Sequence, residues 1–233
     1  FNDFNSKSEM MQFFTQVKEN YRQAIEVSNV TDFWTNQVCR RIAAVIVILI
    51  NPIPITPNIV TVCSFVVNMV ANYQLINNQL GMAASLYFFS HVLDCADGQL
   101  ARLRNVVSKF GMFFDPVLDG LKDLITFLVF IAYFSDSNVF IFSLVGMFNV
   151  SASIVFDWVR HTIQNRPKDI KESHKTLIKR LGIVAWSVPT RNFIIVFSLI
   201  LHYPAAIVYY TCFPGTYFTI RKAWSLVVLL REN

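Results

Sequence analysis

Four aspartates, Asp94, Asp97, Asp115 and Asp119, stand close together in an otherwise apolar part of the chain, and we call them the carboxylate quartet. An acidic side chain at the centre of a bilayer costs at least about 2.5 kcal/mol, and four unpaired carboxylates cannot ionise together in a low-dielectric site. One nearby arginine, Arg102, does not balance four acids, whereas divalent cations do. Carboxylate oxygens select Mg²⁺ or Mn²⁺ over zinc or copper. The quartet therefore predicts two shared divalent ions that clamp a diphosphate while a P–O bond breaks.

Helical spacing would bring the quartet to one point. Positions three and four apart share one face of a helix. Two groups of residues follow this spacing, one on each of two neighbouring helices. They are Asp94, Asp97, Gly98, Ala101 and Arg102 on the first, and Gly111, Asp115 and Asp119 on the second. Antiparallel helices joined near 105–108 would aim all four carboxylates at the same place.

Small residues and an arginine accompany the acids. Gly98 and Ala101 leave room for a ligand against the helix backbone, and Gly111 permits the close approach of two helices. Arg102 can pair with a phosphate through two parallel hydrogen bonds. For each glycine, ordinary helix packing is the alternative interpretation.

The composition indicates what surrounds these residues. Of the 233 residues, 54% are hydrophobic and 22 are phenylalanine, which is typical of an all-α integral membrane protein rather than a soluble domain. The net charge of +5 does not indicate a nucleic-acid partner, because the basic residues fall in loops that flank apolar segments. We therefore expect the lipid bilayer, and no nucleic acid, as a partner.

Six apolar segments have about the length of transmembrane helices. We predict them at 58–76, 81–103, 110–134, 139–163, 188–202 and 205–220, with 223–230 as an alternative extension of the last. Before them, 9–27 is a charged amphipathic helix, and 32–50 is an interfacial helix that lies on the membrane. Residues 1–57 are thus predicted to be a juxtamembrane region, and 58–233 one transmembrane domain.

Lysine and arginine are distributed unevenly between the ends of these segments. The predicted turns at 77–81, 135–138 and 202–204 contain neither. The opposite ends receive Arg40, Arg41, Arg102, Arg104, Lys109, the basic run 160–180, Arg221 and Lys222. Because cytoplasmic loops carry the excess of positive charge, both termini and the quartet are predicted to lie at the cytoplasmic side.

The quartet and its neighbours have the order D-x2-D-G-x2-A-R-x8-G-x3-D-x3-D. This order resembles the signature of the CDP-alcohol phosphotransferase family, and all eight fixed positions match. Residues 56–61, TPNIVT, resemble the T-P-N-x-V-T that begins the family's first transmembrane segment. The wider pattern, an interfacial helix and then six spans, looks most like phosphatidylinositol-phosphate synthases and the inositol-using archaeal-type members.

The resemblance implies a reaction and a cofactor. A hydroxyl acceptor attacks the phosphorus of a CDP-linked alcohol, here CDP-diacylglycerol, and CMP leaves. Two Mg²⁺ ions are implied, with Mn²⁺ as an alternative, one held by Asp94, Asp97 and Asp115 and the other by Asp97, Asp115 and Asp119. Asp119 would also be the general base that takes the proton of the acceptor hydroxyl. Family members are often homodimers, so a second copy of the chain is an implied partner.

The resemblance also implies contacts for both substrates. The CDP group would be held by Pro57, Asn58, Ile59, Val60, Gly98, Ala101, Arg102, Ser108 and Gly111. The acceptor would be held by Lys122, Arg160 and Arg191. Trp158 occupies the place of a lysine that binds acceptor phosphate in the phosphoinositol branch, which counts against a phosphorylated inositol. The alternatives are that Lys122 pairs with Asp123, and that Arg160 and Arg191 reach lipid head groups.

Three other functions are open from the residues. The first is a transferase whose donor is a CDP-linked polar alcohol and whose acceptor is a lipid or glycan hydroxyl. The second is an intramembrane prenyltransferase, which also uses Asp-rich motifs and Mg²⁺ but lacks the Asp-Gly-x2-Ala-Arg element. The third is a divalent-cation transporter, which would spread acids across the bilayer depth, whereas the quartet lies near one face.

Overall fold

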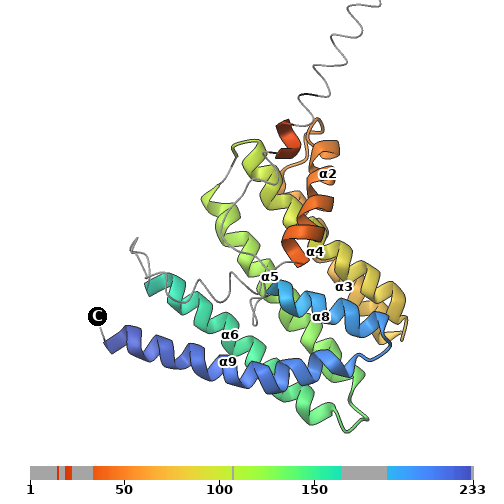
Figure 1. Cartoon of the computed structure of the whole chain (residues 1–233), viewed down its shortest axis with the longest axis vertical. Coiled ribbons are helices and arrows are strands. Elements are labelled where there is room, and N and C mark those ends of the chain that lie inside the picture. The colour runs from red at the N-terminus through yellow and green to blue at the C-terminus, as the bar shows by residue number, and fades with distance from the viewer. Residues whose placement is uncertain (1–14, 16–18, 23–33, 107, 164–187, 232–233) are drawn as a thin grey trace, which may run out of the picture.

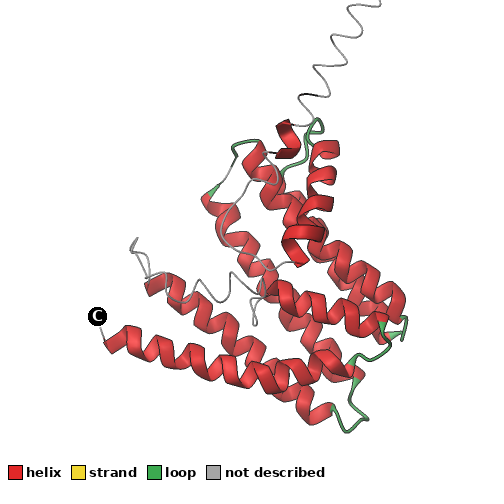
Figure 2. Cartoon of the chain, in the orientation of Figure 1, coloured by secondary structure: helices red, strands yellow, loops and turns green. Residues whose placement is uncertain are grey.

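The computed structural model describes residues 15, 19–22, 34–106, 108–163 and 188–231. Helices are the only regular elements in these ranges (Figure 2), so the all-helical prediction is confirmed for this part of the chain. The predicted amphipathic helix at 9–27 and the basic run after Arg160 fall largely outside the described residues.

The helices follow the predicted segments closely. Their bounds are η1, a π-helical turn, Thr35–Cys39; α2 Arg40–Ile50; α3 Pro57–Ile76; α4 Leu80–Leu103; α5 Lys109–Tyr133; α6 Phe140–Ile163; α8 Val188–Ile200; and α9 Ala205–Arg231. The first five predicted transmembrane segments agree with α3, α4, α5, α6 and α8 to within two residues at each end. The predicted interfacial segment 32–50 corresponds to η1 followed by α2.

Local sequence signals set the starts of α3 and α5, two of the helices that form the site region. Thr56 is extended and Pro57 occupies the first turn of α3, where a missing N–H costs no helical hydrogen bond. Ser108 caps α5, because its Oγ accepts a hydrogen bond from the backbone N–H of Gly111 at 2.9 Å. The two helix starts lie close together, since a Cβ at Gly111 would be 3.3 Å from Oδ1 of Asn58.

The last helix follows the longer of the two predicted alternatives. α9 continues beyond 220 to Arg231 with Pro214 inside it. A proline removes one N–H and often ends a helix. Here Asn149 of α6 donates from Nδ2 to the carbonyl oxygens of Thr211 at 3.0 Å and Cys212 at 3.3 Å, so carbonyls just before the proline gain partners from another helix. The predicted end at 220 is wrong and the alternative extension over 223–230 is confirmed, because α9 runs without a break to Arg231.

The helices pack around α3 at one end of the molecule and around α6 and α9 at the other (Figure 1). α3 packs against both α4 and α5, and α2 lies on α4. α6 lies along α9 and also contacts α5, while α8 packs on both α4 and α9. Gly146 allows the close approach of α6 and α9, since a Cβ there would collide with the Thr211 side chain. The aspartate-bearing α4 and α5 are thereby held by neighbours on several sides.

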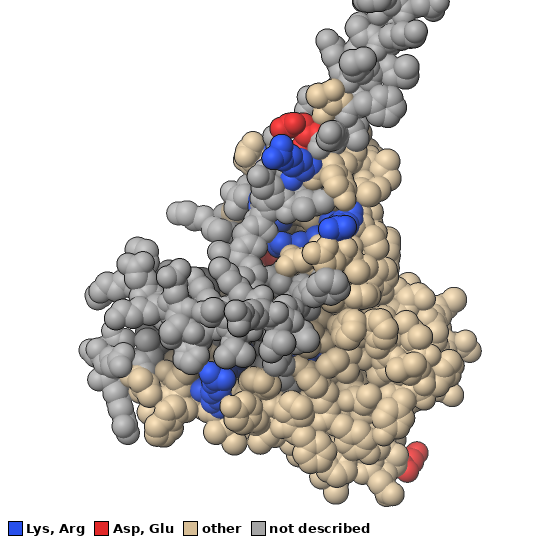
Figure 3. Space-filling model, in the orientation of Figure 1, with Lys and Arg blue, Asp and Glu red and all other residues tan. Residues whose placement is uncertain are grey.

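Beside the apolar core of the bundle, α3 has polar residues on its buried face and apolar residues on its exposed face. The buried face of α3 carries Thr61, Ser64, Asn68 and Asn72, and its exposed face carries Ile59, Val62, Val66 and Val70. Globular proteins in water show the opposite preference. On the face drawn in Figure 3, few charged side chains reach the described surface. This distribution favours a lipid surrounding, in which polar groups must find partners inside the protein.

The number of membrane crossings stays a prediction. Among the described helices, α3 alone is long and apolar enough to cross a bilayer on length and composition. Phe140–Phe156 and Val188–Ile200 are shorter apolar stretches. The quartet lies on α4 and α5, and these acids reduce the apolar character of the two helices that carry them.

Candidate active site

α4 and α5 bring three members of the quartet together. Asp94, Asp97 and Asp115 each offer one carboxylate oxygen, and these oxygens lie within 4.8 Å of one another. Thr61 of α3 donates from Oγ1 to Oδ2 of Asp97 at 2.6 Å, which leaves Oδ1 of Asp97 for another partner. Oδ1 of Asp115 is buried and accepts no hydrogen bond from any described residue. Three hard oxygen donors, one of them buried and unsatisfied, fit a divalent cation.

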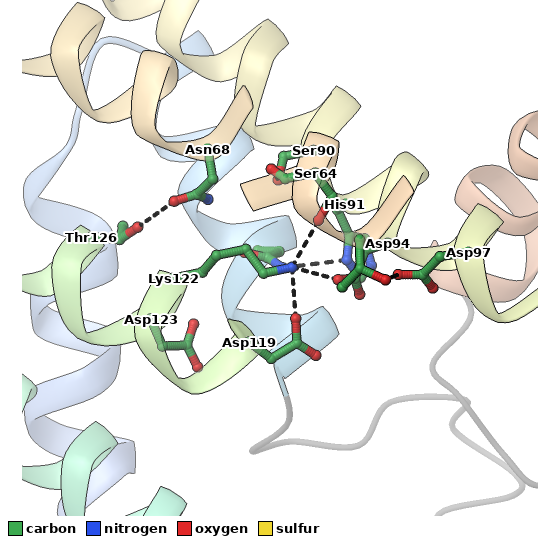
Figure 4. A network of polar contacts seen from close by, with 12 residues as sticks. Ser64, Asn68, Ser90, His91, Asp94, Asp97, Asp119, Lys122, Asp123 and Thr126 are labelled. Atoms are coloured by element: carbon green, nitrogen blue, oxygen red, sulfur yellow. Dashed lines mark hydrogen bonds and ion pairs between the residues drawn. The ribbon is translucent and has the colours of Figure 1, made fainter. Parts of the chain in front are cut away.

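Asp119 lies beside this set and shares an ion-pair partner with Asp94. Its Oδ1 is 2.6 Å from Nζ of Lys122, which also contacts Oδ1 of Asp94 and lies 3.1 Å from Oγ of Ser64 (Figure 4). All four acids thus gather in one region, as expected from their spacing. The alternative that Lys122 pairs with Asp123 is wrong, because consecutive residues of a helix point about 100° apart.

Asp123 pairs with Arg191 of α8 instead. Nη2 of Arg191 contacts Oδ2 of Asp123, and the two residues are only 3% and 7% exposed. The alternative that Arg191 reaches lipid head groups is therefore wrong, since its charge is balanced inside the protein. Arg160, the third residue predicted to hold the acceptor, belongs to α6, but its side chain and that of Trp158 lie outside the described part of the chain.

A cavity of about 450 Å³ opens beside the three carboxylates, between α3, α4 and α5. Seven of the nine residues predicted to hold the CDP group line it: Pro57, Asn58, Gly98, Ala101, Arg102, Ser108 and Gly111. Thr56, Thr61, Asp97, Arg104, Val106 and Asp115 complete the lining. Ile59 and Val60 are not in the lining. Ile59 is 50% exposed and Val60 packs in an apolar cluster with Val92, because both lie on other faces of α3.

Residues 54–221, most of the chain, match the family of CDP-alcohol phosphatidyltransferases. The chain belongs to this family. The three grouped carboxylates and the whole lining of the cavity lie within the matched range. The family resemblance of the aspartate motif is thereby confirmed over a much longer part of the chain than the motif itself.

Curated relatives carry several substrate names. The chain is 36% identical over 114 residues to a CDP-diacylglycerol–serine O-phosphatidyltransferase of Helicobacter pylori, a match that covers 48% of this chain and 46% of the relative. It is 36% identical over 101 residues to an archaetidylinositol phosphate synthase of Pyrococcus horikoshii, covering 42% and 53%. A bifunctional IPC transferase and DIPP synthase of Archaeoglobus fulgidus is 34% identical over 117 residues, covering 49% and 22%. The chain spans about half the length of the first two relatives.

Two glycines shape the cavity of this CDP-alcohol phosphatidyltransferase family member. A Cβ at Gly98 would lie 3.3 Å from Nη1 of Arg102, so the glycine lets the guanidinium fold back along α4. A Cβ at Gly111 would lie 3.1 Å from Oγ of Ser108 and 3.3 Å from Oδ1 of Asn58. Nε of Arg102 is buried and donates to no described residue, so this arginine retains a hydrogen-bond donor at the cavity. These features suit an anionic ligand that lies close to the backbone.

Arg104 was assigned from the sequence only to the basic cytoplasmic side, and the structure gives it a second role. Its guanidinium donates to Oδ1 of Asn51 at 3.2 Å and to the backbone carbonyls of Ile50 at 3.1 Å, Asn51 at 2.8 Å, Ile53 at 2.7 Å and Ile55. The sequence signal was present in NPIPI, since prolines lack the N–H groups that would otherwise order the turn. Arg104 thus ties the turn that leads into Thr56 to the end of α4.

An Arg104→Gln variant is expected to bind the CDP-linked donor more weakly. Loss of several hydrogen bonds, each worth about 1 kcal/mol, frees the turn before Thr56 and raises KM for the donor about tenfold. The turnover number should change much less, because Arg104 contacts none of the carboxylates through a hydrogen bond or ion pair given by the structure. Steady-state kinetics with varied donor concentration measures KM for the donor and the turnover number. Arg41→Gln is the matched control, because Arg41 is exposed and bonds Gln37 at 2.6 Å; an equal rise in KM there would contradict the assignment.

A second, much smaller polar pocket of about 20 Å³ lies on the other side of the carboxylates. Asp94, Asp119 and Lys122 line it together with His91 and Asn192. The His91 ring makes contacts of 3.2 Å to Oγ1 of Thr35 and 3.3 Å to Nδ2 of Asn192, so it joins η1, α4 and α8. The volume has room for about one water. Helical spacing did not single out His91 or Asn192, because their partners are distant in sequence.

Proposed function

We propose that this chain transfers a substituted phosphate group from CDP-diacylglycerol to a hydroxyl acceptor and releases CMP, as a step of phospholipid synthesis. The observation that carries this proposal is that two of the three grouped carboxylates line the 450 Å³ cavity. Asp97 and Asp115 belong both to the carboxylate group and to the cavity lining. A metal ion held by the carboxylates would therefore lie next to a diphosphate bound in the cavity. Membership of the CDP-alcohol phosphatidyltransferase family supports the same reaction class.

Each part of the site has a role in this reaction. Asp94, Asp97 and Asp115 would hold a divalent cation, Mg²⁺ or Mn²⁺, which when bound supplies positive charge to the phosphoryl oxygens. Arg102 would pair with a phosphate of the donor through its guanidinium. Asp119 would accept the proton of the acceptor hydroxyl, because it lies next to the metal-binding set and is partly open, with a side chain 27% exposed.

The charge balance favours an acceptor without a phosphate group. Lys122 is paired with Asp94 and Asp119, and Arg191 is paired with Asp123. Both described cations that were predicted to hold the acceptor therefore have their charge balanced inside the protein. A small polar alcohol such as serine, the acceptor named for the Helicobacter pylori relative, suits this arrangement. A phosphorylated inositol is the second candidate, favoured by the match to the archaetidylinositol phosphate synthase.

We place the reaction in a bilayer, with the site near the cytoplasmic face. The exposed apolar residues of α3 and the polar residues on its buried face support the lipid surrounding. The basic residues Arg102 and Arg104, at the same ends of the helices as the cavity, support the cytoplasmic orientation. Six crossings would then follow from α3, α4, α5, α6, α8 and α9, with η1 and α2 at the interface.

The proposal is tested with membranes that contain the chain and have been washed with alkaline carbonate. We expect CMP release that requires CDP-diacylglycerol, a divalent cation and serine, and that stays in the washed membrane fraction. Faster release with inositol phosphate than with serine would select the second acceptor. Activity only with isoprenyl diphosphates, or metal flux in proteoliposomes without any nucleotide, would instead support the prenyltransferase or the transporter.

A further inference from the structure

Two residues just before α2 pack against both α4 and α8. The indole of Trp34 lies on Phe88 of α4, with ring centroids 5.6 Å apart. It also contacts two rings of α8, Phe193 at 5.1 Å and Phe197 at 5.8 Å. The next residue, Thr35, is only 3% exposed. We call Trp34 and Thr35 the wedge, since they join two helices of the predicted transmembrane domain from outside it.

A buried histidine of α4 connects the wedge to α8. Nε2 of His91 lies 3.2 Å from Oγ1 of Thr35, and Nδ1 lies 3.3 Å from Nδ2 of Asn192 on α8. An amide nitrogen can only donate, so Nδ1 of His91 accepts from Asn192. Nε2 then carries the ring proton and donates it to the hydroxyl oxygen of Thr35. The ring is therefore oriented at both of its nitrogens, once by η1 and once by α8.

These contacts reach the side of the site that the acceptor has to enter. The acceptor hydroxyl must approach Asp119, the proposed base, and Asp119 lines the small pocket of about 20 Å³ but not the large cavity. His91 and Asn192 line the same small pocket, together with Val188 and Ile195 of α8. The large cavity lies between α3, α4 and α5 instead. The position of α8 against α4 therefore shapes the acceptor side and leaves the donor side alone.

We propose that the wedge, His91 and Asn192 are positioning residues that hold α8 against α4 and thereby determine how tightly the acceptor binds. This inference rests on the proposed function, because it assigns the acceptor to the side of Asp119. The wedge acts through His91 and needs no contact with either substrate. Altering it changes the affinity for the acceptor and leaves the affinity for the CDP-linked donor as it is.

The two Michaelis constants, measured by CMP release from membranes that contain the full chain, test this proposal. Thr35→Val keeps the shape of the side chain but removes the oxygen that accepts from His91. We expect KM for the acceptor, serine or inositol phosphate, whichever releases CMP faster, to rise about tenfold, as the loss of one buried hydrogen bond implies. KM for CDP-diacylglycerol should change by less than about twofold. Thr35→Ser keeps the hydroxyl and should restore the normal KM for the acceptor.

A double variant shows whether the effect passes through His91. Asn192→Leu removes the other contact of the ring and should raise KM for the acceptor in the same way, which also covers the case in which Thr35→Val does not fold. If both residues act by orienting the ring, adding Thr35→Val to Asn192→Leu raises this KM little further. Effects that multiply would show two independent contributions and would contradict the role of His91.

The matched control removes a buried hydrogen bond between two other helices. Thr219 of α9 is 7% exposed and donates from Oγ1 to the carbonyl oxygen of Asn149 at 3.4 Å, so Thr219→Val should leave both Michaelis constants unchanged. An unchanged KM for the acceptor in Thr35→Val, or an equal rise in both constants, would overturn the inference and leave the proposed reaction standing. No CMP release by the unmodified chain would overturn both.

Discussion

An Asp119→Asn variant is expected to transfer the phosphate group at least about 100-fold more slowly than the unmodified chain, because a positioned general base contributes about 10²- to 10⁴-fold. The asparagine keeps the shape and still offers Oδ1 to Lys122, but it cannot take a proton from the acceptor hydroxyl. Lys122 also keeps its contact with Asp94, so no buried charge is left alone. The turnover number should fall while KM for the donor stays nearly constant, which is measured by initial rates of CMP release.

Two comparisons make this result specific. Asp136→Asn removes the same charge from an exposed turn between α5 and α6 and should leave the rate unchanged. Thermal unfolding of Asp119→Asn should resemble that of the unmodified chain, which separates lost chemistry from lost folding. Turnover close to normal in Asp119→Asn would remove Asp119 from the role of base.

Most helix bounds are predictable from the sequence because local signals set them. Thr56 and Pro57 mark the start of α3, and Ser108 marks the start of α5. The predicted last segment, 205–220, already passes through Pro214, but its sequence does not show what supports the helix there. The support includes Asn149, whose amide meets the carbonyls of Thr211 and Cys212 from a separate helix. A hydrogen bond between distant segments leaves no periodic trace in either one.

The same division applies to the site. The gathering of the quartet follows from helical spacing, and so do most of the cavity positions. Spacing predicts only ion pairs within one helix, such as Asp119 with Lys122 three residues later, and not those between helices. Asp123 lies next to Lys122 in sequence, yet its partner is Arg191, and Lys122 turns towards Asp94 and Asp119. The partners Asp94 and Arg191 come from α4 and α8, so only the structure shows that the charge of Lys122 is balanced inside the protein.

An Asp115→Asn variant is expected to lose metal binding by a large factor and to reverse the effect of the metal on stability. Asp115 contributes one of three converging oxygens, and its Oδ1 has no other described partner. Removing this carboxylate deletes a charged ligand of the cation, so the Kd for Mn²⁺ should rise at least about 100-fold. This loss exceeds that from removing a residue that only hydrogen-bonds to a metal ligand. Transfer activity should fall in parallel.

The direction of the stability change distinguishes a metal ligand from a structural acid. Without metal, Asp115 faces Asp94 and Asp97, and like charges in one site repel, so Asp115→Asn should unfold at a higher temperature than the unmodified chain in EDTA. With Mn²⁺ at one hundred times its Kd, the unmodified chain gains about 2.7 kcal/mol, and the variant gains little. The order of the two melting temperatures should therefore reverse between EDTA and Mn²⁺. If Asp115 only supported the fold, the variant would melt earlier under both conditions, because no bound cation would offset the lost carboxylate.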